Sequence, residues 1–189
     1  MTEKNIIQIF LPFLFIFFFL LPTSSLCENT PKIKLIKDQE YFPVVNEAIK
    51  EAKRSIEVIA FEMGYYPEHP SSPSNILIQN LIVAGKRGVD VRVILEVSSW
   101  NPRVTEKNKL SGRILCQGRV KVRYDLPFIT THAKLIIIDS NIAILGSNNW
   151  TYYSLTQNKE LSLLVEGYPD IIKELENYFD KLWEESSPS

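Results

Sequence analysis

The feature that most limits the fold of this chain is a pair of short apolar runs separated by three turn-forming residues. Residues 133–138 and 142–145 are almost entirely aliphatic, and Asp139, Ser140 and Asn141 stand between them. Short apolar runs bounded by such residues are typical of buried strands joined by a tight turn. The sequence therefore predicts a β-hairpin in the protein interior.

Polar residues stand where this hairpin begins and ends. His132 and Lys134 enter the first strand, and Ser147 and Asn149 follow the second. Side chains two residues apart in a strand share a face, and the return of the hairpin brings the second pair beside the first. We therefore expect an imidazole, a cation and two neutral polar groups to converge. Asp139 lies an odd number of residues after Lys134, so we assign it to the turn.

The rest of the chain alternates between strand and helix patterns. Strands are predicted at residues 33–36, 55–61, 89–96, 120–124 and 161–165, and helices at residues 43–54, 75–86, 105–116 and 169–183. The Pro- and Ser-rich stretch at residues 65–74 is predicted to be a loop. This order predicts an α/β domain with helices packed on both faces of a mixed β-sheet.

The first 27 residues differ in kind from the rest. An apolar run at residues 6–21 is followed by Pro22 and by small residues up to Cys27. This pattern is typical of an export signal, or, if it is not removed, of an N-terminal membrane anchor. We expect the domain at residues 28–189 to be exported, either periplasmic or secreted, and in the second case tethered to the membrane by residues 6–21.

The spacing of the polar residues resembles the phospholipase D superfamily. The signature of that family is His-x-Lys, four residues, Asp, six residues and Gly-Ser-x-Asn, and residues 132–149 match it at every fixed position. The segments 85–93 and 158–160 also look like the small secreted bacterial endonucleases of the family. The resemblance implies a phospholipase-D-like fold from about residue 31 to the end.

The resemblance also implies roles for individual residues. His132 would attack phosphorus and form a phosphohistidine, while Lys134, Ser147 and Asn149 would stabilise the phosphate oxygens without a metal ion or another cofactor. Glu160 would accept a hydrogen bond from the imidazole and stabilise its charged form. The chain is therefore interpreted as a phosphodiesterase.

A single histidine does not complete this chemistry, because an acid must protonate the leaving oxygen from the opposite side. The other histidine, His69, lies in the Pro- and Ser-rich loop without a lysine two residues later, and is predicted to be a surface residue. Larger members of the family carry the motif twice, and small ones dimerise. We therefore expect a homodimer in which two copies of His132 share one site.

The choice of substrate depends on charge and on aromatic residues. The net charge of −1 argues against an overall basic nucleic-acid-binding protein, so any such site must be local. The basic residues Arg103, Lys107, Lys109, Arg113, Arg119, Lys121 and Arg123 are concentrated in one stretch.

With Trp100, Phe128 or Trp150, this stretch could follow a nucleic-acid backbone and stack bases. We favour a DNA or RNA endonuclease on this basis. The same aromatic residues could instead enter lipid, which keeps a phospholipase D releasing phosphatidic acid as the alternative. A binding module that has lost catalysis is a third interpretation.

Overall fold

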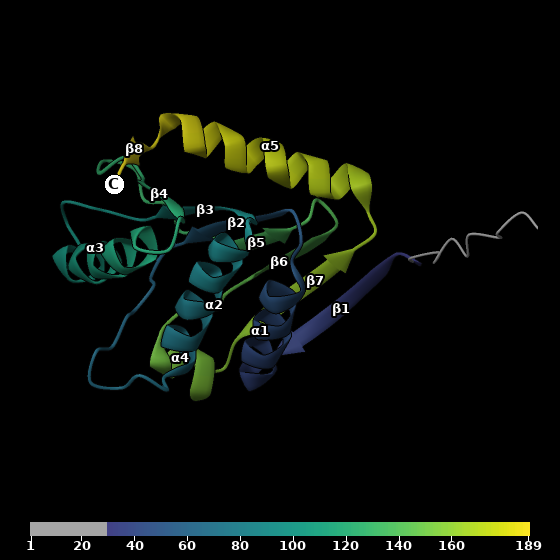
Figure 1. Cartoon of the computed structure of the whole chain (residues 1–189), viewed down its shortest axis with the longest axis horizontal. Coiled ribbons are helices and arrows are strands. Elements are labelled where there is room, and N and C mark those ends of the chain that lie inside the picture. Colours follow the sequence, from purple (N-terminus) through teal and green to yellow (C-terminus); the bar gives the residue numbers. More distant parts are fainter. Residues whose placement is uncertain (1–29) are drawn as a thin grey trace, which may run out of the picture.

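Eight strands form one mixed sheet in the computed structural model, which describes residues 30–189 (Figure 1). The strand order is β1-β7-β6-β5-β2-β3-β4-β8. β2, β3 and β4 run parallel, and the other neighbouring strands pair antiparallel. The strands are β1 (Lys32–Lys37), β2 (Ser55–Ala60), β3 (Asp90–Leu95), β4 (Lys121–Tyr124), β5 (Leu135–Ile138), β6 (Ile142–Gly146), β7 (Leu161–Glu166) and β8 (Ser187–Pro188).

Helices cover both faces of the sheet, as the sequence predicts, but they do so unequally (Figure 1). One face carries the larger core, under four helices, and the other face carries α5 alone. The helices are η1 (Asp38–Glu40), α1 (Tyr41–Glu51), α2 (Pro73–Arg87), α3 (Pro102–Cys116), α4 (Tyr152–Thr156) and α5 (Pro169–Glu185). On the face that carries α5, this helix packs on β5 and β6 and does not extend over β1 and β7. That part of the face is left uncovered.

The predicted hairpin is confirmed as β5 and β6, with Ile138 paired to Ile142. Asp139 and Ser140 have φ angles of 54° and 53°, which is the left-handed conformation that a type I′ turn requires. Asp139 tolerates this conformation better than most residues because its short polar side chain bonds locally.

The connections bring five strand ends to one edge of the sheet, which we call the site edge. β2 ends there at Ala60, paired with the last residue of β3, Leu95. The antiparallel strand β5 begins there at Leu135. β6 ends there at Gly146, and β7 begins there at Leu161. Residues that flank these positions are therefore gathered from distant parts of the sequence.

Two details of the prediction were wrong. The first strand of the hairpin begins at Leu135 and not at Ala133, because its neighbour β2 ends opposite that point. His132 and Lys134 therefore lie in an irregular segment before β5 and not within a strand. The short helix α4 and the two-residue strand β8 were not predicted at all.

No helix within residues 30–189 is long and apolar enough to cross a membrane. The export signal or membrane anchor predicted at residues 1–27 lies outside the described residues and stays a prediction.

Candidate active site

His132 and Lys134 are held together at the site edge by an aromatic ring. The exposed imidazole of His132 packs against Phe61, the residue after β2, with 4.5 Å between ring centroids. Lys134 Nζ lies 4.8 Å from the centre of the same ring and donates a 2.6 Å hydrogen bond to the backbone oxygen of His132. The sequence analysis missed Phe61, whose only signal was its position at the end of a buried strand.

The two groups perturb each other electrostatically. Partial burial and the neighbouring positive charge of Lys134 lower the pKa of His132. Burial lowers the pKa of Lys134, against the opposing effect of the Glu160 carboxylate. A lowered pKa keeps the imidazole neutral at neutral pH, and the neutral form is the nucleophilic one. The geometry therefore places an exposed imidazole beside a cation.

Asn149 follows β6, the second strand of the hairpin, and lies beside Lys134 at the site edge. Its backbone N–H donates to Ser154 Oγ at 2.9 Å, which fixes the residue after β6. Its side-chain Oδ1 is buried and has no hydrogen-bond partner within residues 30–189. Lys134, Asn148 and Asn149 line one small cavity at the site edge. The unpaired atom of Asn149 is thus the hydrogen-bond acceptor of its amide group, beside Lys134.

Glu160 lies just before β7, and two serine hydroxyl groups donate hydrogen bonds to its carboxylate. Its carboxylate accepts hydrogen bonds from Ser147 Oγ, from Ser154 Oγ at 2.7 Å and from Asn158 Nδ2 at 3.3 Å. The hydrogen bond expected from His132 is not present among the described residues. Both carboxylate oxygens of Glu160 are already bonded by donors of its own neighbourhood, whereas the imidazole packs on Phe61.

The structure therefore divides the expected quartet of polar side chains. Lys134 and Asn149 share one cavity, while Ser147 lines a neighbouring cavity with Glu160. Ser147 Oγ also accepts the backbone N–H of Leu161 at 3.1 Å, which ties the end of β6 to the start of β7. Ser147 therefore links β6 to β7, and its hydroxyl group donates a hydrogen bond to Glu160 at the rim of the site.

Asp139 lies in the turn, at the end of the hairpin away from the site edge. Its carboxylate accepts hydrogen bonds from the backbone N–H groups of Lys53, Arg54 and Ser55 at 2.9, 2.6 and 3.0 Å. Although burial raises its pKa, these hydrogen bonds and the charge of Arg54 outweigh burial and lower it. Asp139 thus fastens the hairpin turn to the connection between α1 and β2.

Comparison with known proteins identifies the family of this chain. Residues 45–183 match the family model described as cardiolipin synthase, PLD-like domain. The chain belongs to the phospholipase D superfamily. The resemblance inferred from the signature is thereby confirmed, although the match does not itself assign roles to individual residues.

Two curated relatives illustrate the range of this superfamily. The mitochondrial cardiolipin hydrolase of Xenopus laevis is 32% identical over 138 residues, which are 73% of this chain and 59% of the relative. The virion nicking-joining enzyme of vaccinia virus is 26% identical over 168 residues, which are 85% of this chain and 38% of the relative. The chain thus spans less than two thirds of either relative.

Two solved structures confirm the fold. Nuc from Salmonella typhimurium, a phospholipase D family member, superposes with a TM-score of 0.71 at 23% identity, over 85% of this chain and 99% of that one. NucT from Helicobacter pylori gives a TM-score of 0.68 at 18% identity, over 85% of this chain and all of that one. The mixed sheet and its helices are therefore those of a phospholipase-D-like domain.

The surroundings of the site correct part of the substrate prediction. Trp150 is 3% exposed and its indole N–H donates to Tyr41 at 3.1 Å, so it cannot stack a base. Trp100 and Phe128 are exposed, on loops at the site edge.

Three of the seven basic side chains in the basic stretch of this phospholipase-D-like protein already have partners within the protein. Lys107 pairs with Glu62, Lys121 pairs with Asp90, and Arg123 bonds the end of α5. The remaining four side chains are exposed and form no ion pair within the described part of the chain; they are Arg103, Lys109, Arg113 and Arg119.

A buried pair of carboxyl groups, also missed from the sequence, holds the segment before His132. Glu96, which follows β3, is 1% exposed and accepts the backbone N–H of Thr131 at 2.7 Å. Asp125 accepts the hydroxyl of the same Thr131. Burial raises the pKa of Glu96 to about 7, and the Asp125 carboxylate adds to this effect, although the Thr131 hydrogen bond lowers it.

This pKa leads to a prediction about stability. Because folding raises the pKa of Glu96 from 4.5 to about 7, the folded state holds a proton that the unfolded state has lost between these pH values. The free energy of unfolding should therefore fall as pH rises through this window, by about 3 kcal/mol, and remain lower above it. Glu96→Gln should remove this dependence and raise the melting temperature at pH 8.

Thermal unfolding from pH 4.5 to pH 8.5 measures this effect, with Glu106→Gln on the surface of α3 as the matched control. The control variant should follow the wild-type profile. An unchanged pH profile in Glu96→Gln would show that Glu96 is ionised throughout.

Proposed function

We propose that this protein is a phosphodiesterase that cleaves nucleic acid through a covalent intermediate on His132, without a metal ion. The observation that carries the proposal is an exposed imidazole with a lowered pKa, placed with Lys134 on the ring of Phe61. Membership of the phospholipase D superfamily supports the same chemistry.

The reaction would proceed in two displacements. In the first, a ring nitrogen of His132 attacks phosphorus, an N–P bond forms, and the bond to the leaving oxygen breaks. Lys134 and the amide N–H groups of Asn149 donate to the non-bridging oxygens and stabilise their negative charge. In the second, water attacks phosphorus and gives a proton to the group that protonated the leaving oxygen, the N–P bond breaks, and His132 is regenerated. Ser147 and Glu160 would hold the rim of the site and balance the charge of Lys134.

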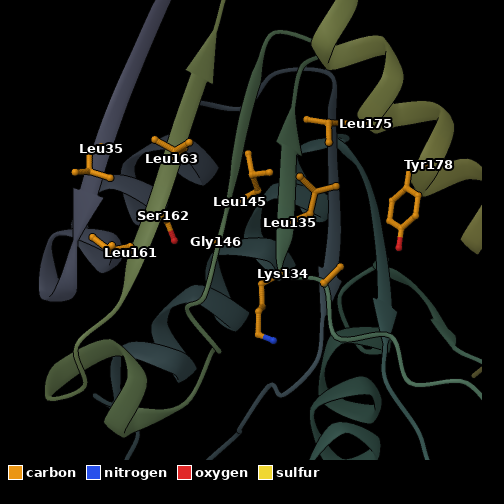
Figure 2. A pocket seen from close by; sticks show the side chains of 11 residues that line it. Leu35, Lys134, Leu135, Leu145, Gly146, Leu161, Ser162, Leu163, Leu175 and Tyr178 are labelled. Atoms are coloured by element: carbon orange, nitrogen blue, oxygen red, sulfur yellow. The ribbon is translucent and has the colours of Figure 1, made fainter.

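The leaving oxygen needs a proton in the first step, and we propose that a second copy of the chain supplies it. An apolar face lies beside Lys134 on the side of the sheet that carries α5 (Figure 2). Leu35, Leu161 and Leu163 are 49%, 57% and 41% exposed there, around a hollow of about 680 Å³. An exposed apolar face of this kind is typical of an interaction surface. A two-fold axis at this face would bring two His132 side chains together.

Nucleic acid is favoured as the substrate by the four unpaired basic side chains of α3 and the following turn. They offer positive charge without overall basicity, as a local phosphate-binding surface requires. The name of the vaccinia relative, a nicking-joining enzyme, is consistent with this choice.

Phospholipid is the second candidate, because one observation favours it. Trp100, Phe128 and Ile129 are 58%, 79% and 66% exposed on loops at the site edge, and the last two lie shortly before His132. Apolar side chains in such a place can enter a lipid surface. The name of the cardiolipin hydrolase relatives is consistent with this alternative.

The proposal is tested with the purified domain, supercoiled plasmid DNA and phosphatidylcholine vesicles, each in the presence of a chelator. We expect nicking of the plasmid, and an acid-labile phosphate on His132 after rapid quenching. Release of phosphatidic acid without any DNA cleavage would replace nucleic acid by phospholipid as the substrate. Loss of all activity in the chelator would contradict the metal-independent mechanism.

A further inference from the structure

The connection between β2 and α2 forms, together with α4, a cavity that the proposed displacement at phosphorus does not use. The cavity has a volume of about 540 Å³. Its walls include Tyr66 and His69 from the connection, Ser72 at the start of α2, and Tyr152 and Tyr153 from α4. Three aromatic rings, an imidazole and a hydroxyl group thus surround one space.

The connection is held in place by buried side chains, so the cavity exists before any ligand binds. Asn75 accepts the backbone N–H of Tyr66 at 2.9 Å and donates to the backbone oxygens of Tyr66 and His69 at 2.8 and 3.0 Å. Ser74 Oγ donates to the backbone oxygen of Trp150 at 2.7 Å. Both side chains are at most 1% exposed. A loop fastened in this way positions its aromatic side chains without a large entropic cost on binding.

The cavity lies beside the candidate active site. Tyr152 follows Asn149 by three residues, so their Cα atoms are at most about 11 Å apart. Ser154, in the same helix, bonds both the backbone of Asn149 and the carboxylate of Glu160. A nucleotide next to a phosphate at His132 therefore lies within reach of this cavity.

The chemistry of the walls suits a neutral aromatic ring. Tyr153 is 64% exposed and meets Tyr152 edge-on at 5.5 Å between centroids, which leaves a ring face open for stacking. Ser72 is 4% exposed, and its hydroxyl oxygen has no hydrogen-bond partner among residues 30–189, not even as the N-cap of α2. An unpaired buried hydroxyl is costly unless a ligand satisfies it.

We propose that this cavity is a subsite for a nucleobase adjacent to the cleaved phosphate, an inference that rests on the proposed nucleic-acid substrate. The base stacks on Tyr153, and Ser72 and His69 bond its edge. Three tyrosine rings also suit a quaternary ammonium group, but that group has no atom that can satisfy the unpaired hydroxyl of Ser72, whereas the edge of a base has. This subsite gives a function to the loop at residues 65–74.

The subsite is tested by replacing the ring of Tyr153. Tyr153→Leu should weaken the binding of a short fluorescein-labelled single-stranded oligonucleotide by roughly 5- to 100-fold, because stacking of one base contributes strongly to affinity. Tyr153→Phe, the matched control, keeps the ring and should stay within roughly twofold of the wild type. Fluorescence anisotropy measures the dissociation constants. The turnover number on saturating bis(p-nitrophenyl) phosphate should be the same in all three proteins, because Tyr153 does not touch the reacting groups; stacking of a nitrophenyl ring on Tyr153 would change only the KM.

Unchanged oligonucleotide binding by Tyr153→Leu would overturn the subsite. Weaker binding to phosphatidylcholine vesicles instead of the oligonucleotide would also overturn it, and would identify the cavity as a headgroup site. If the wild type turns over bis(p-nitrophenyl) phosphate but does not bind the oligonucleotide, the subsite and the nucleic-acid substrate both fail. If it binds the oligonucleotide through Tyr153 but does not cleave it, the subsite stands and only the proposed reaction fails.

Discussion

His132→Ala should lower the turnover number for both plasmid DNA and bis(p-nitrophenyl) phosphate by at least about 10³-fold. The imidazole is the only group at the site edge with a lowered pKa and an exposed ring nitrogen beside a cation, so nothing among the described residues can replace it as nucleophile. Initial rates measured in a chelator test this expectation. The melting temperature should change little, because the ring is exposed and contacts mainly Phe61.

His69→Ala is the matched control for this substitution. His69 lies in the connection between β2 and α2 and lines the neighbouring cavity, not the one around Lys134. Its loss should leave the turnover of bis(p-nitrophenyl) phosphate unchanged. Retained activity in His132→Ala, together with lost activity in His69→Ala, would transfer the nucleophilic role to His69 and refute the proposed mechanism.

The elements that could be predicted from the sequence are those with strong local signals. The hairpin was found because its aliphatic runs and its turn residues agree, and Asp139 was assigned to the turn because of its spacing. Gly88 ends α2 in the left-handed conformation, with a φ of 96°, which glycine adopts more readily than other residues. Such features depend on local backbone preferences and on the two-residue alternation of side chains in a strand. They can therefore be predicted without knowledge of distant contacts.

The parts of the site that the sequence did not predict depend on contacts between distant segments. Phe61 meets His132 only because β2 and β5 are neighbours in the sheet. Glu96 reaches Thr131 because β3 ends at the same edge. The partner of Glu160 was predicted incorrectly, since spacing places the carboxylate near the site but does not decide which donor it meets. Strand order, which the local patterns do not specify, determines all three contacts.

Leu163→Arg should convert the protein to a monomer and lower its turnover number by about 10²- to 10⁴-fold, because an active site without a second histidine lacks the acid for the leaving oxygen. Leu163 lies between Leu35 and Leu145 in the register of β1, β7 and β6, at the middle of the exposed apolar face. A charge there opposes burial against a second copy. Sedimentation velocity measures the association state, and rates on bis(p-nitrophenyl) phosphate measure the activity.

Val83→Arg is the matched control, since Val83 is a similarly exposed aliphatic residue on α2, on the opposite face of the sheet. It should remain dimeric and active.

Mixing experiments sharpen the same prediction. If two His132 side chains share one site, equilibration with excess His132→Ala should suppress wild-type activity, because most wild-type chains then pair with an inactive partner. His132→Ala that also carries Leu163→Arg cannot pair and should not suppress it. A wild-type protein that sediments as a monomer with full activity, or that keeps its activity in the first mixture, would show that one chain holds the complete catalytic machinery. The acid would then have to come from that chain's own residues at the site edge.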